Sequence, residues 1–458
     1  MDNLSRRFFI NSSLSAAAGA FVQTPLKQSA PTGDWPSHGW DVEQTRFNRN
    51  ETAIVPETVS RLELRWQFEA GSGITGTPAV IGDKVVIASW DGKVYSLDRL
   101  TGKAGWVFDA GLRSYPPDRR LGIFSSPAVF GRTVYIASDR LLALDIDTGR
   151  RKWERTIGDP DKTFEYFWAP PVVHNGSVYA GVSAGSETST RGRLVSVDAH
   201  VGSLRWSFFT VGPGVAGGAL FAAPSIDPHT GTLYAATGSP YHMRPGRLPF
   251  SCSLIAIDAL DGVLRWADQV HAHDTHNMDL NCPPMLVAAE RHGRQSKLIV
   301  VGGKDGIRAW DRNTHKRLWH VQLTPSLPPN GTESLPTSGP ETGPTAAAHG
   351  LIFFASNNHQ DKTCQIAALD AGTGDIRWVH TLPAFQFGPM SVAGGLVFLG
   401  LADGKMRAWR AKDGEALWES AASQPIAGGP AIARGMVFVG TGAGRYIPGD
   451  KLLAFGLK

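Results

Sequence analysis

Short apolar runs separated by glycine- and aspartate-rich turns recur along almost the whole chain. In the first clear unit these runs are Thr77–Val80, Lys84–Ser89, Lys93–Asp98 and Ala104–Phe108. They are rich in Val, Ile, Tyr and Phe and are bounded by Gly and Asp, which is the pattern of short β-strands. The pattern predicts a unit of four short strands in an all-β protein.

A tryptophan recurs at the same place in eight copies of this unit. In most copies a strand that ends in Leu-Asp or Val-Asp is followed by a Thr-Gly-type turn, then by charged residues, then by the Trp. The eight residues are Trp66, Trp106, Trp153, Trp206, Trp266, Trp319, Trp378 and Trp418. A four-stranded unit repeated in this way is typical of the blades of a β-propeller. We expect the indole rings to pack between adjacent blades and not to form a substrate site.

The turns before these tryptophans carry their own signal. Thr101-Gly102, Thr148-Gly149 and Thr373-Gly374 supply the positive φ that a tight hairpin turn requires. The fifth unit has Asn313-Thr314-His315 instead, and there we expect a longer or a strained turn.

The two ends of the repeat are complementary. Leu64–Phe68 reads as an outer strand with no blade before it. At the other end, Gly429–Ala433, Met436–Gly440 and Lys451–Phe455 are three strands without a fourth. Ring closure, in which the N-terminal strand completes the last blade, removes the exposed edges. We therefore predict an eight-bladed β-propeller over residues 34–458.

The first thirty residues differ from the rest of the chain. Ser5-Arg6-Arg7-Phe8-Phe9 precedes a mildly apolar stretch, Ile10–Val22, that is rich in Ala and Ser. This arrangement resembles a twin-arginine export signal. It predicts that residues 1–30 are a signal and that the mature protein is periplasmic or secreted.

Composition limits the remaining function classes. The formal net charge is only +4 on 458 residues, and no basic run or basic-aromatic stripe favours a nucleic-acid partner. No stretch is long and apolar enough to span a bilayer. For an oxidising compartment, three cysteines predict one disulfide and one free thiol, with Cys252 and Cys282 the preferred pair over Cys364. The sequence has no Cys-x-x-Cys-His motif, so we expect no covalently attached haem.

The repeat as a whole resembles the quinoprotein alcohol dehydrogenase-like propellers. The resemblance rests on the Ala-Leu-Asp…Thr-Gly…Trp repeat and on two N-terminal segments, Trp35–Asp41 and Thr45-Arg46-Phe47. Those segments look like the start of the pyrroloquinoline quinone (PQQ) enzymes, including those acting on polyvinyl alcohol. The family's non-catalytic outer-membrane assembly scaffolds generally lack them. The resemblance implies PQQ and a metal ion over the central tunnel, with an Asp as base.

Two segments are similar to the family's site motifs. Glu187 follows Gly181–Ser186 and resembles the metal-binding glutamate, while a solvated loop residue is the competing interpretation. Lys304, within Gly302–Gly306, matches the family's cation that contacts the quinone oxygens. The competing interpretation is a surface lysine in a hairpin. Carboxylate oxygens suit a hard cation such as Ca²⁺ or a lanthanide.

Other positions depart from the family pattern. Where the catalytic Asp is expected the chain has Asn277, so Asp274 and Asp279 become the candidate catalytic carboxylates. Ser239 stands where the metal-binding Asn is expected, and Phe221 replaces the floor Trp beneath the cofactor. In many members of the family a disulfide between adjacent cysteines forms a ceiling over the cofactor, and this chain has no adjacent cysteines. The resemblance implies a metal set of Glu187, Ser239, Asn277 and Asp279, and cofactor contacts from Lys304, Phe221, Glu187 and Trp168.

The residues around Asp274 also allow a second interpretation, a metal site, that does not depend on the family resemblance. Three histidines, two aspartates and a cysteine fall close together and suit zinc or copper: His271, His273, Asp274, His276, Asp279 and Cys282. Their spacing matches no standard structural zinc motif, which favours a solvated or tunnel-lining cluster instead.

These observations lead to one hypothesis and one rival. The first is an exported PQQ-dependent dehydrogenase of a small or polymeric alcohol that passes electrons to a separate carrier. The rival is a non-catalytic propeller that binds a protein or polymer in the periplasm. The lost base, floor and ceiling favour the rival, while the N-terminal segments, Glu187 and Lys304 favour the enzyme.

Overall fold

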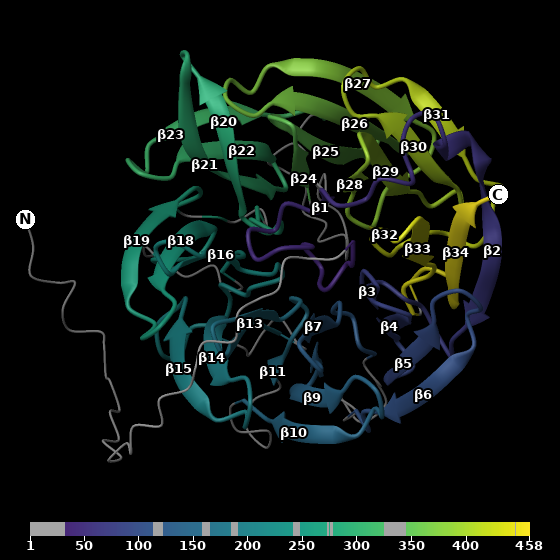
Figure 1. The fold of residues 1–458 in the computed structure, drawn as a ribbon. Coiled ribbons are helices and arrows are strands. Elements are labelled where there is room, and N and C mark those ends of the chain that lie inside the picture. The colour runs from purple at the N-terminus through teal and green to yellow at the C-terminus, as the bar shows by residue number, and fades with distance from the viewer. Residues whose placement is uncertain are drawn as a thin grey trace, which may run out of the picture.

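Eight sheets stand in a ring, as predicted (Figure 1). The computed structural model describes residues 33–112, 122–157, 165–184, 191–240, 248–272, 274, 278–324, 345–444 and 446–458. The expected signal therefore lies outside the described residues, and the bounds 1–30 and 34–458 stay predictions. The regular structure described is strand, apart from one short 3₁₀ turn, η1 (Val59–Arg61).

Each blade runs antiparallel from an inner to an outer strand, and the first four follow chain order. Blade 1 holds β3 (Ala79–Ile81), β4 (Lys84–Ala88), β5 (Lys93–Asp98) and β6 (Ala104–Asp109). Blade 2 holds β7 (Ala128–Phe130), β8 (Thr133–Ala137), β9 (Leu141–Asp145) and β10 (Arg151–Arg155). Blade 3 holds β12 (Val172–His174), β13 (Ser177–Ala184), β14 (Arg193–Asp198) and β15 (Leu204–Phe209), with β11 (Glu165–Tyr166) added. Blade 4 holds β16 (Ser225–Asp227), β17 (Thr232–Ala236), β18 (Ser253–Asp258) and β19 (Leu264–Gln269).

The remaining blades repeat this order until the ring closes. Blade 5 holds β20 (Met285–Arg291), β21 (Arg294–Gly303), β22 (Gly306–Asp311) and β23 (Arg317–Val321). Blade 6 holds β24 (Ala346–Ala348), β25 (Leu351–Asn358), β26 (Thr363–Asp370) and β27 (Ile376–Leu382). Blade 7 holds β28 (Ser391–Ala393), β29 (Leu396–Gly400), β30 (Met406–Arg410) and β31 (Ala416–Glu419), with β1 (Phe47–Asn48) paired to β28. Blade 8 holds β32 (Ala431–Ala433), β33 (Met436–Gly440), β34 (Lys451–Leu457) and β2 (Leu62–Glu69).

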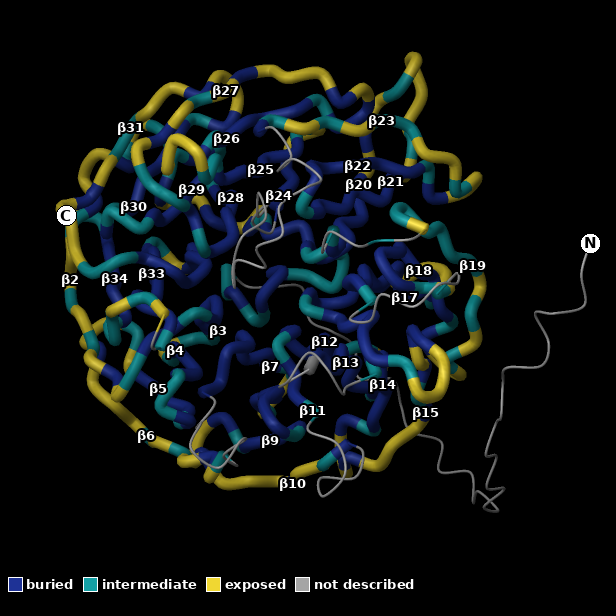
Figure 2. The backbone as a smooth tube through the Cα atoms, turned by 180° about the vertical axis from the view of Figure 1, so that it is seen from behind, coloured by how far each residue is buried: buried dark blue, intermediate teal, exposed yellow. Residues whose placement is uncertain are grey.

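Blade 8 confirms the predicted closure. Strand β2 pairs antiparallel with β34, from Leu62 opposite Leu457 to Glu69 opposite Lys451. The first strand of the ring is thus the outer strand of the last blade. Figure 2 shows the consequence for burial: inner strands are buried, and the exposed backbone follows the outer rim.

The repeated tryptophans join neighbouring blades, as expected. In seven of the eight, the indole Nε1–H donates to a main-chain oxygen of the next blade. For Trp418 this oxygen is Leu62 O, in the closing strand β2 of blade 8. The turn glycine of the next blade lies against the indole; a Cβ on Gly149, for example, would come within 2.7 Å of Trp106. Glycine is therefore needed both for its positive φ and for space.

The exceptional turn of blade 5 keeps the same length. His315 N–H donates to Asp311 O over 2.8 Å, as the glycine does in the other turns. His315 adopts a φ of 58°, and its ring stacks on Trp266 at 4.5 Å. Of the two expectations the strained turn is correct, because a non-glycine residue occupies the left-handed region.

The N-terminal segment crosses the centre of the ring (Figure 1). Main-chain oxygens of Trp35, Pro36, Val42, Glu43, Thr45 and Arg46 accept from the inner strands of blades 1, 2, 4, 5, 6 and 7. The Arg46 guanidinium is buried among oxygens that come from blades 7, 8 and 1 and from His38. The segment is therefore an axial strut that links most of the blades.

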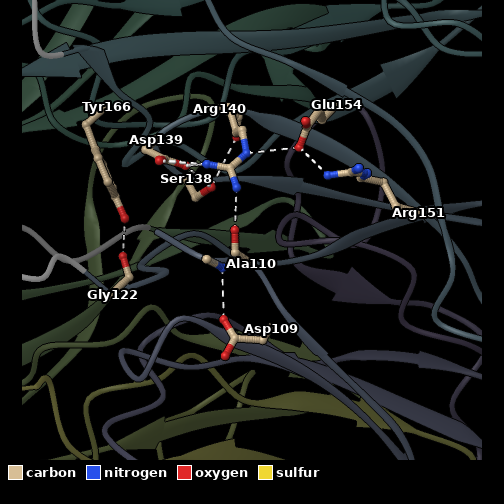
Figure 3. Close-up of polar contacts among 10 residues, drawn as sticks. Asp109, Ala110, Gly122, Ser138, Asp139, Arg140, Arg151, Glu154 and Tyr166 are labelled. Carbon is tan, nitrogen blue, oxygen red and sulfur yellow. Dashed lines mark hydrogen bonds and ion pairs between the residues drawn. The ribbon is translucent and has the colours of Figure 1, made fainter. Parts of the chain in front are cut away.

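Two kinds of connection share one face of the ring, which we call the site face. They are the links from the second to the third strand of a blade and from an outer strand to the next inner strand. Charged side chains there join blades: Asp305 binds Arg308 and lies 3.0 Å from His271 of the preceding connection. In blade 2, Arg140 binds Asp139 and donates to Ala110 O of the preceding connection (Figure 3).

The predicted disulfide is wrong. Cys252, Cys282 and Cys364 are all free and buried. Each thiol faces partners of its own: the Cys252 thiol lies beside Ser239 and Asp274, and that of Cys282 beside Asn281. The connections that carry Cys252 and Cys282 therefore hold them apart.

Candidate functional site

The site face brings three segments of blades 4 and 5 together. Ser239 lies between β17 and β18, Asp274 and Asp279 lie between β19 and β20, and Lys304 follows β21. Each segment connects strands of blades 4 and 5, so the rigid sheets anchor both ends of the connections that carry the polar residues.

An ion pair lies at the centre of this group. Lys304 Nζ is 2.7 Å from Asp279 Oδ2, and Lys304 N–H also donates to Asp279 O over 3.1 Å. Asp279 Oδ1 accepts the main-chain N–H of Ser239 at 2.6 Å. Asp279 is only 5% exposed, so the pair is largely desolvated and its geometry is held tightly.

The Ser239 hydroxyl connects this pair to the second carboxylate. Ser239 Oγ–H donates to Asp274 Oδ2 over 2.5 Å. The same oxygen accepts the Met278 N–H at 2.8 Å and the Cys252 thiol at 3.5 Å. Burial and the neighbouring Asp274 raise the pKa of Cys252, so the thiol stays protonated and acts as a donor.

Phe221 lies near Asp279, at the position where the family pattern led us to expect the floor. A Cβ on Gly238 would come within 3.0 Å of the Phe221 ring and 2.8 Å of Asp279 Oδ1. Gly238 therefore lets an aromatic face and a carboxylate approach the same point, which no larger residue allows.

Trp168 lies in a separate group of rings on the same face. It stacks on Phe124 with a centroid distance of 4.3 Å, and Phe124 contacts Trp90 at 4.1 Å. Tyr446 extends the group at 5.9 Å from Trp90. We call these four residues the aromatic arc. They come from the connections around blades 1, 2, 3 and 8.

Two of the predicted ligands, Glu187 and Asn277, lie outside the described residues, as do His273 and His276. The structure does bring together Ser239, Asp274, Asp279, Lys304 and Phe221. His271 lies with Asp305, in the contact between blades 4 and 5. Within the described ranges, no three His, Cys, Asp or Glu side chains are arranged to hold a metal ion.

The donor set is that of a site for a hard cation and an anionic group. Two carboxylates and a hydroxyl converge, and oxygens of this kind suit Ca²⁺ or a lanthanide better than zinc or copper. Lys304 adds a fixed positive charge, and Phe221 a flat apolar face. The described residues therefore fit a planar, negatively charged cofactor with an oxygen-bound metal.

A cavity of about 710 Å³ lies away from this group. It opens on the opposite face between blades 1 and 2, where Lys84 and Arg132 both pair with Asp147. Because it lies on the opposite face, the cavity adds nothing to the candidate site.

Sequence reasoning missed Cys252 and most of the aromatic arc. Cys252 follows Gly238 by more than ten residues, and only the folded connection places its thiol beside Asp274. Trp90 carried a signal that was not used, because Ser89-Trp90-Asp91 places a large aromatic residue directly after a strand.

Comparison with known proteins now identifies the family. The family model described as glucose/ethanol/alcohol dehydrogenase, β-propeller domain, matches residues 35–325. The chain belongs to this family. A second model, that of the outer membrane protein assembly factor BamB, matches residues 303–452.

Individual relatives agree with this assignment. A polyvinylalcohol dehydrogenase from a Pseudomonas species is 27% identical, over 92% of this chain and 75% of the relative. A quinohemoprotein alcohol dehydrogenase structure from Pseudomonas putida HK5 superposes with a TM-score of 0.82 at 21% identity, covering 93% of this chain and 80% of that one. A europium-containing methanol dehydrogenase gives 0.80 at 20%, covering 93% and 98%. The structural likenesses confirm the fold, and these relatives are oxidoreductases, as the enzyme hypothesis expects.

No helix in the described part of the chain is long and apolar enough to cross a membrane.

Proposed function

We propose that this protein is an exported, PQQ-dependent alcohol dehydrogenase whose site is the group around Ser239. The observation that carries the proposal is the convergence of Asp274, Asp279 and Lys304 on that residue, on the site face of a propeller of this family. The polyvinylalcohol dehydrogenase relatives favour an alcohol, polymers included, as the substrate.

The proposed roles follow from the chemistry of each side chain. Asp279 and Ser239 supply oxygens to the metal, with Glu187 and Asn277 completing the set. Lys304 balances the negative charge of the cofactor, and Phe221 lies against its ring, with Trp168 as a further contact. Asp274, next to Ser239, takes the proton of the substrate hydroxyl.

PQQ, when bound with its metal, supplies the acceptor for the hydride of the alcohol carbon. The chain's own residues orient the alcohol and hold the charges in place. Since the sequence has no haem-attachment motif, we propose that the electrons leave through a separate carrier.

A second candidate function is a non-catalytic propeller that binds a protein or polymer in the periplasm. The match of residues 303–452 to the outer-membrane assembly factor favours it. The Asn at position 277 favours it too, since an amide cannot act as a carboxylate base.

Titration of metal-free protein with PQQ, with and without Ca²⁺ or La³⁺, separates the two. Thermal unfolding and quinone absorbance are followed together, and dye reduction with alcohols comes next. Saturable, metal-dependent binding with a rise in Tm is expected. Absence of binding with every metal, in folded protein, overturns the dehydrogenase proposal and leaves the partner-binding propeller.

The same titration on Lys304→Met tests the assigned residues. Loss of the fixed charge should weaken PQQ binding by about tenfold or more. Lys103→Met is the matched control, because Lys103 is exposed in a turn on the opposite face. Equal effects of the two changes would remove Lys304 from the site.

A further inference from the structure

We propose that the aromatic arc of Trp90, Phe124, Trp168 and Tyr446 binds the carbon chain of the alcohol beyond its reacting carbon. This proposal rests on the proposed function and narrows its substrate class to alcohols with an extended, methylene-rich chain.

The arc is built before any ligand arrives. Trp90 Nε1–H donates to Thr75 Oγ1 over 2.9 Å, and Thr75 in turn donates to Phe124 O over 3.1 Å. A Cβ on Gly122 would come within 2.1 Å of the Trp90 backbone, and one on Gly444 within 2.1 Å of its ring. Trp90 is thus wedged between two segments that only glycine permits, so little side-chain entropy is lost on binding.

The segment that carries Phe124 is fixed as well. The Tyr166 hydroxyl donates to Gly122 O, two residues before Phe124 (Figure 3). Tyr166 and Phe124 also lie 5.3 Å apart, centroid to centroid. The connection between blades 1 and 2 is therefore anchored to blade 3 at the point where the ring projects.

The arc is buried at Phe124 and reaches solvent at Tyr446. Phe124 is 8% exposed and forms its base, Trp90 and Trp168 are half-buried, and Tyr446 is 54% exposed at its outer end. A row of neighbouring rings with an exposed outer end suits a flexible chain, which can bury successive methylene groups against it. A very small alcohol would not reach beyond the innermost ring.

Buried hydrogen bonds join the segment that carries Trp168 to the segment that carries Phe221. Trp168 N–H donates to Ser183 Oγ over 3.3 Å, and Ser183 Oγ–H donates to Leu220 O over 2.8 Å. Leu220 is followed directly by Phe221, whose ring lies beside Gly238 and Asp279. In this proposal, a chain whose hydroxyl end reaches Asp274 extends over Phe221 toward Trp168 and Trp90.

The test compares alcohol series in the holoenzyme. KM and kcat are measured for ethanol, butanol, hexanol and octanol and for polyvinyl alcohol, in wild type, Tyr446→Ala and Tyr446→Phe. Tyr446→Ala is preferred to removal of Trp90, which would leave a hole between Gly122 and Gly444. Leu260→Ala, in an 81% exposed position of a turn on the opposite face, is the remote control.

In wild type, KM should fall as the chain lengthens. Tyr446→Ala should raise KM for octanol and polyvinyl alcohol by roughly tenfold, with kcat and the ethanol KM unchanged. Tyr446→Phe keeps the ring and should behave as wild type, as should Leu260→Ala. A KM independent of chain length, or an unchanged profile in Tyr446→Ala, overturns the proposal.

Calorimetric binding of polyvinyl alcohol to the cofactor-free protein separates the two proposals. If alcohols are not oxidised but the polymer binds and Tyr446→Ala weakens it, the dehydrogenase proposal fails and the arc stands. If oxidation is robust and Tyr446→Ala changes neither binding nor KM, the arc fails and the dehydrogenase proposal stands.

Discussion

Arg46 shows how one residue holds several blades. Its guanidinium is 1% exposed, and an oxygen accepts each of its five N–H groups: Met390 O, His38 O, Thr77 Oγ1, Ser391 Oγ and Pro430 O. Burial lowers the pKa of Arg46 to about 9, which still leaves it charged at neutral pH. With every donor used, Arg46 is a structural cation and not an anion site.

Arg46→Met should therefore destabilise the protein strongly. The change leaves several buried oxygens without donors, and each costs about 1–3 kcal/mol, so a total loss of roughly 3 kcal/mol or more is expected. Urea unfolding measures it. Arg49→Met on the same segment is the control, because Arg49 is half-exposed in its ion pair with Asp41 and should cost less than about 1 kcal/mol. Similar losses for both would contradict the role of Arg46.

Asp305 makes the stability of the folded protein depend on pH. Burial alone would raise its pKa, but the hydrogen bonds and charges of Arg308 and His271 hold that pKa well below its usual range. Because the folded pKa is depressed, the stabilisation is present above the unfolded pKa of about 4 and is lost as pH falls toward the folded value.

Asp305→Asn should accordingly be most harmful at neutral pH. The difference in Tm between wild type and this variant is expected to be full above about pH 5 and to shrink progressively below about pH 4. Thermal scans between these conditions measure it. Asp83→Asn, whose side chain is 86% exposed, serves as control and should show no such trend. A Tm difference that grows on acidification would contradict this assignment.

At the scale of the elements, the contact between a turn glycine and the preceding tryptophan is the repeated unit of blade packing. Gly149→Ala places a Cβ at a φ of 69° and within 2.7 Å of Trp106. Gly131→Ala has a comparable φ of 59° but open space around it. The second change should cost about 1 kcal/mol for the backbone alone, and the first about 2–3 kcal/mol, because the ring must also move. Chemical denaturation compares them, and equal costs would show that the indole contact contributes nothing.

The elements were the most predictable part of the molecule. Short strands, the Thr-Gly turns and the closing strand Leu64–Phe68 follow from local sequence, because a strand's own residues and its turn fix it. The closure was confirmed by β2 beside β34. The disulfide was wrong, because the connections that carry Cys252 and Cys282 give each thiol a separate polar partner.

The candidate site was less predictable for a physical reason. Sequence and family resemblance pointed to Ser239, Asp279 and Lys304 one at a time, and their functional roles stay predictions. Their mutual contacts depend on how blades 4 and 5 pack, which no local pattern encodes. The aromatic arc is an extreme case, since Trp90 and Tyr446 are more than three hundred residues apart and meet only because the ring closes.

Closure at the rim and the strut at the axis are two separate devices at the scale of the whole molecule. Strand β2 joins the first and last residues of the ring at its outside, while the segment Trp35–Arg46 binds inner strands of six blades. Asn48 extends the strut to a seventh blade, because its Nδ2 donates to Ile432 O over 2.8 Å. A chain can keep the first device and lose the second.

A protein that begins at residue 50 would test that separation, because it keeps β2 and so the closure of blade 8. It loses the main-chain bonds of the strut and the buried Arg46, so a loss of more than about 5 kcal/mol is expected. A protein that begins at residue 33 lacks only the residues before the strut and should unfold like the full chain. Scanning calorimetry of the two truncations and the full chain decides the matter. If the strut belongs to the same cooperative unit as the blades, its removal lowers the temperature of a single transition. If the protein that begins at residue 50 melts like the full chain, β2 alone closes the ring and the axial segment is stabilised by the blades without stabilising them.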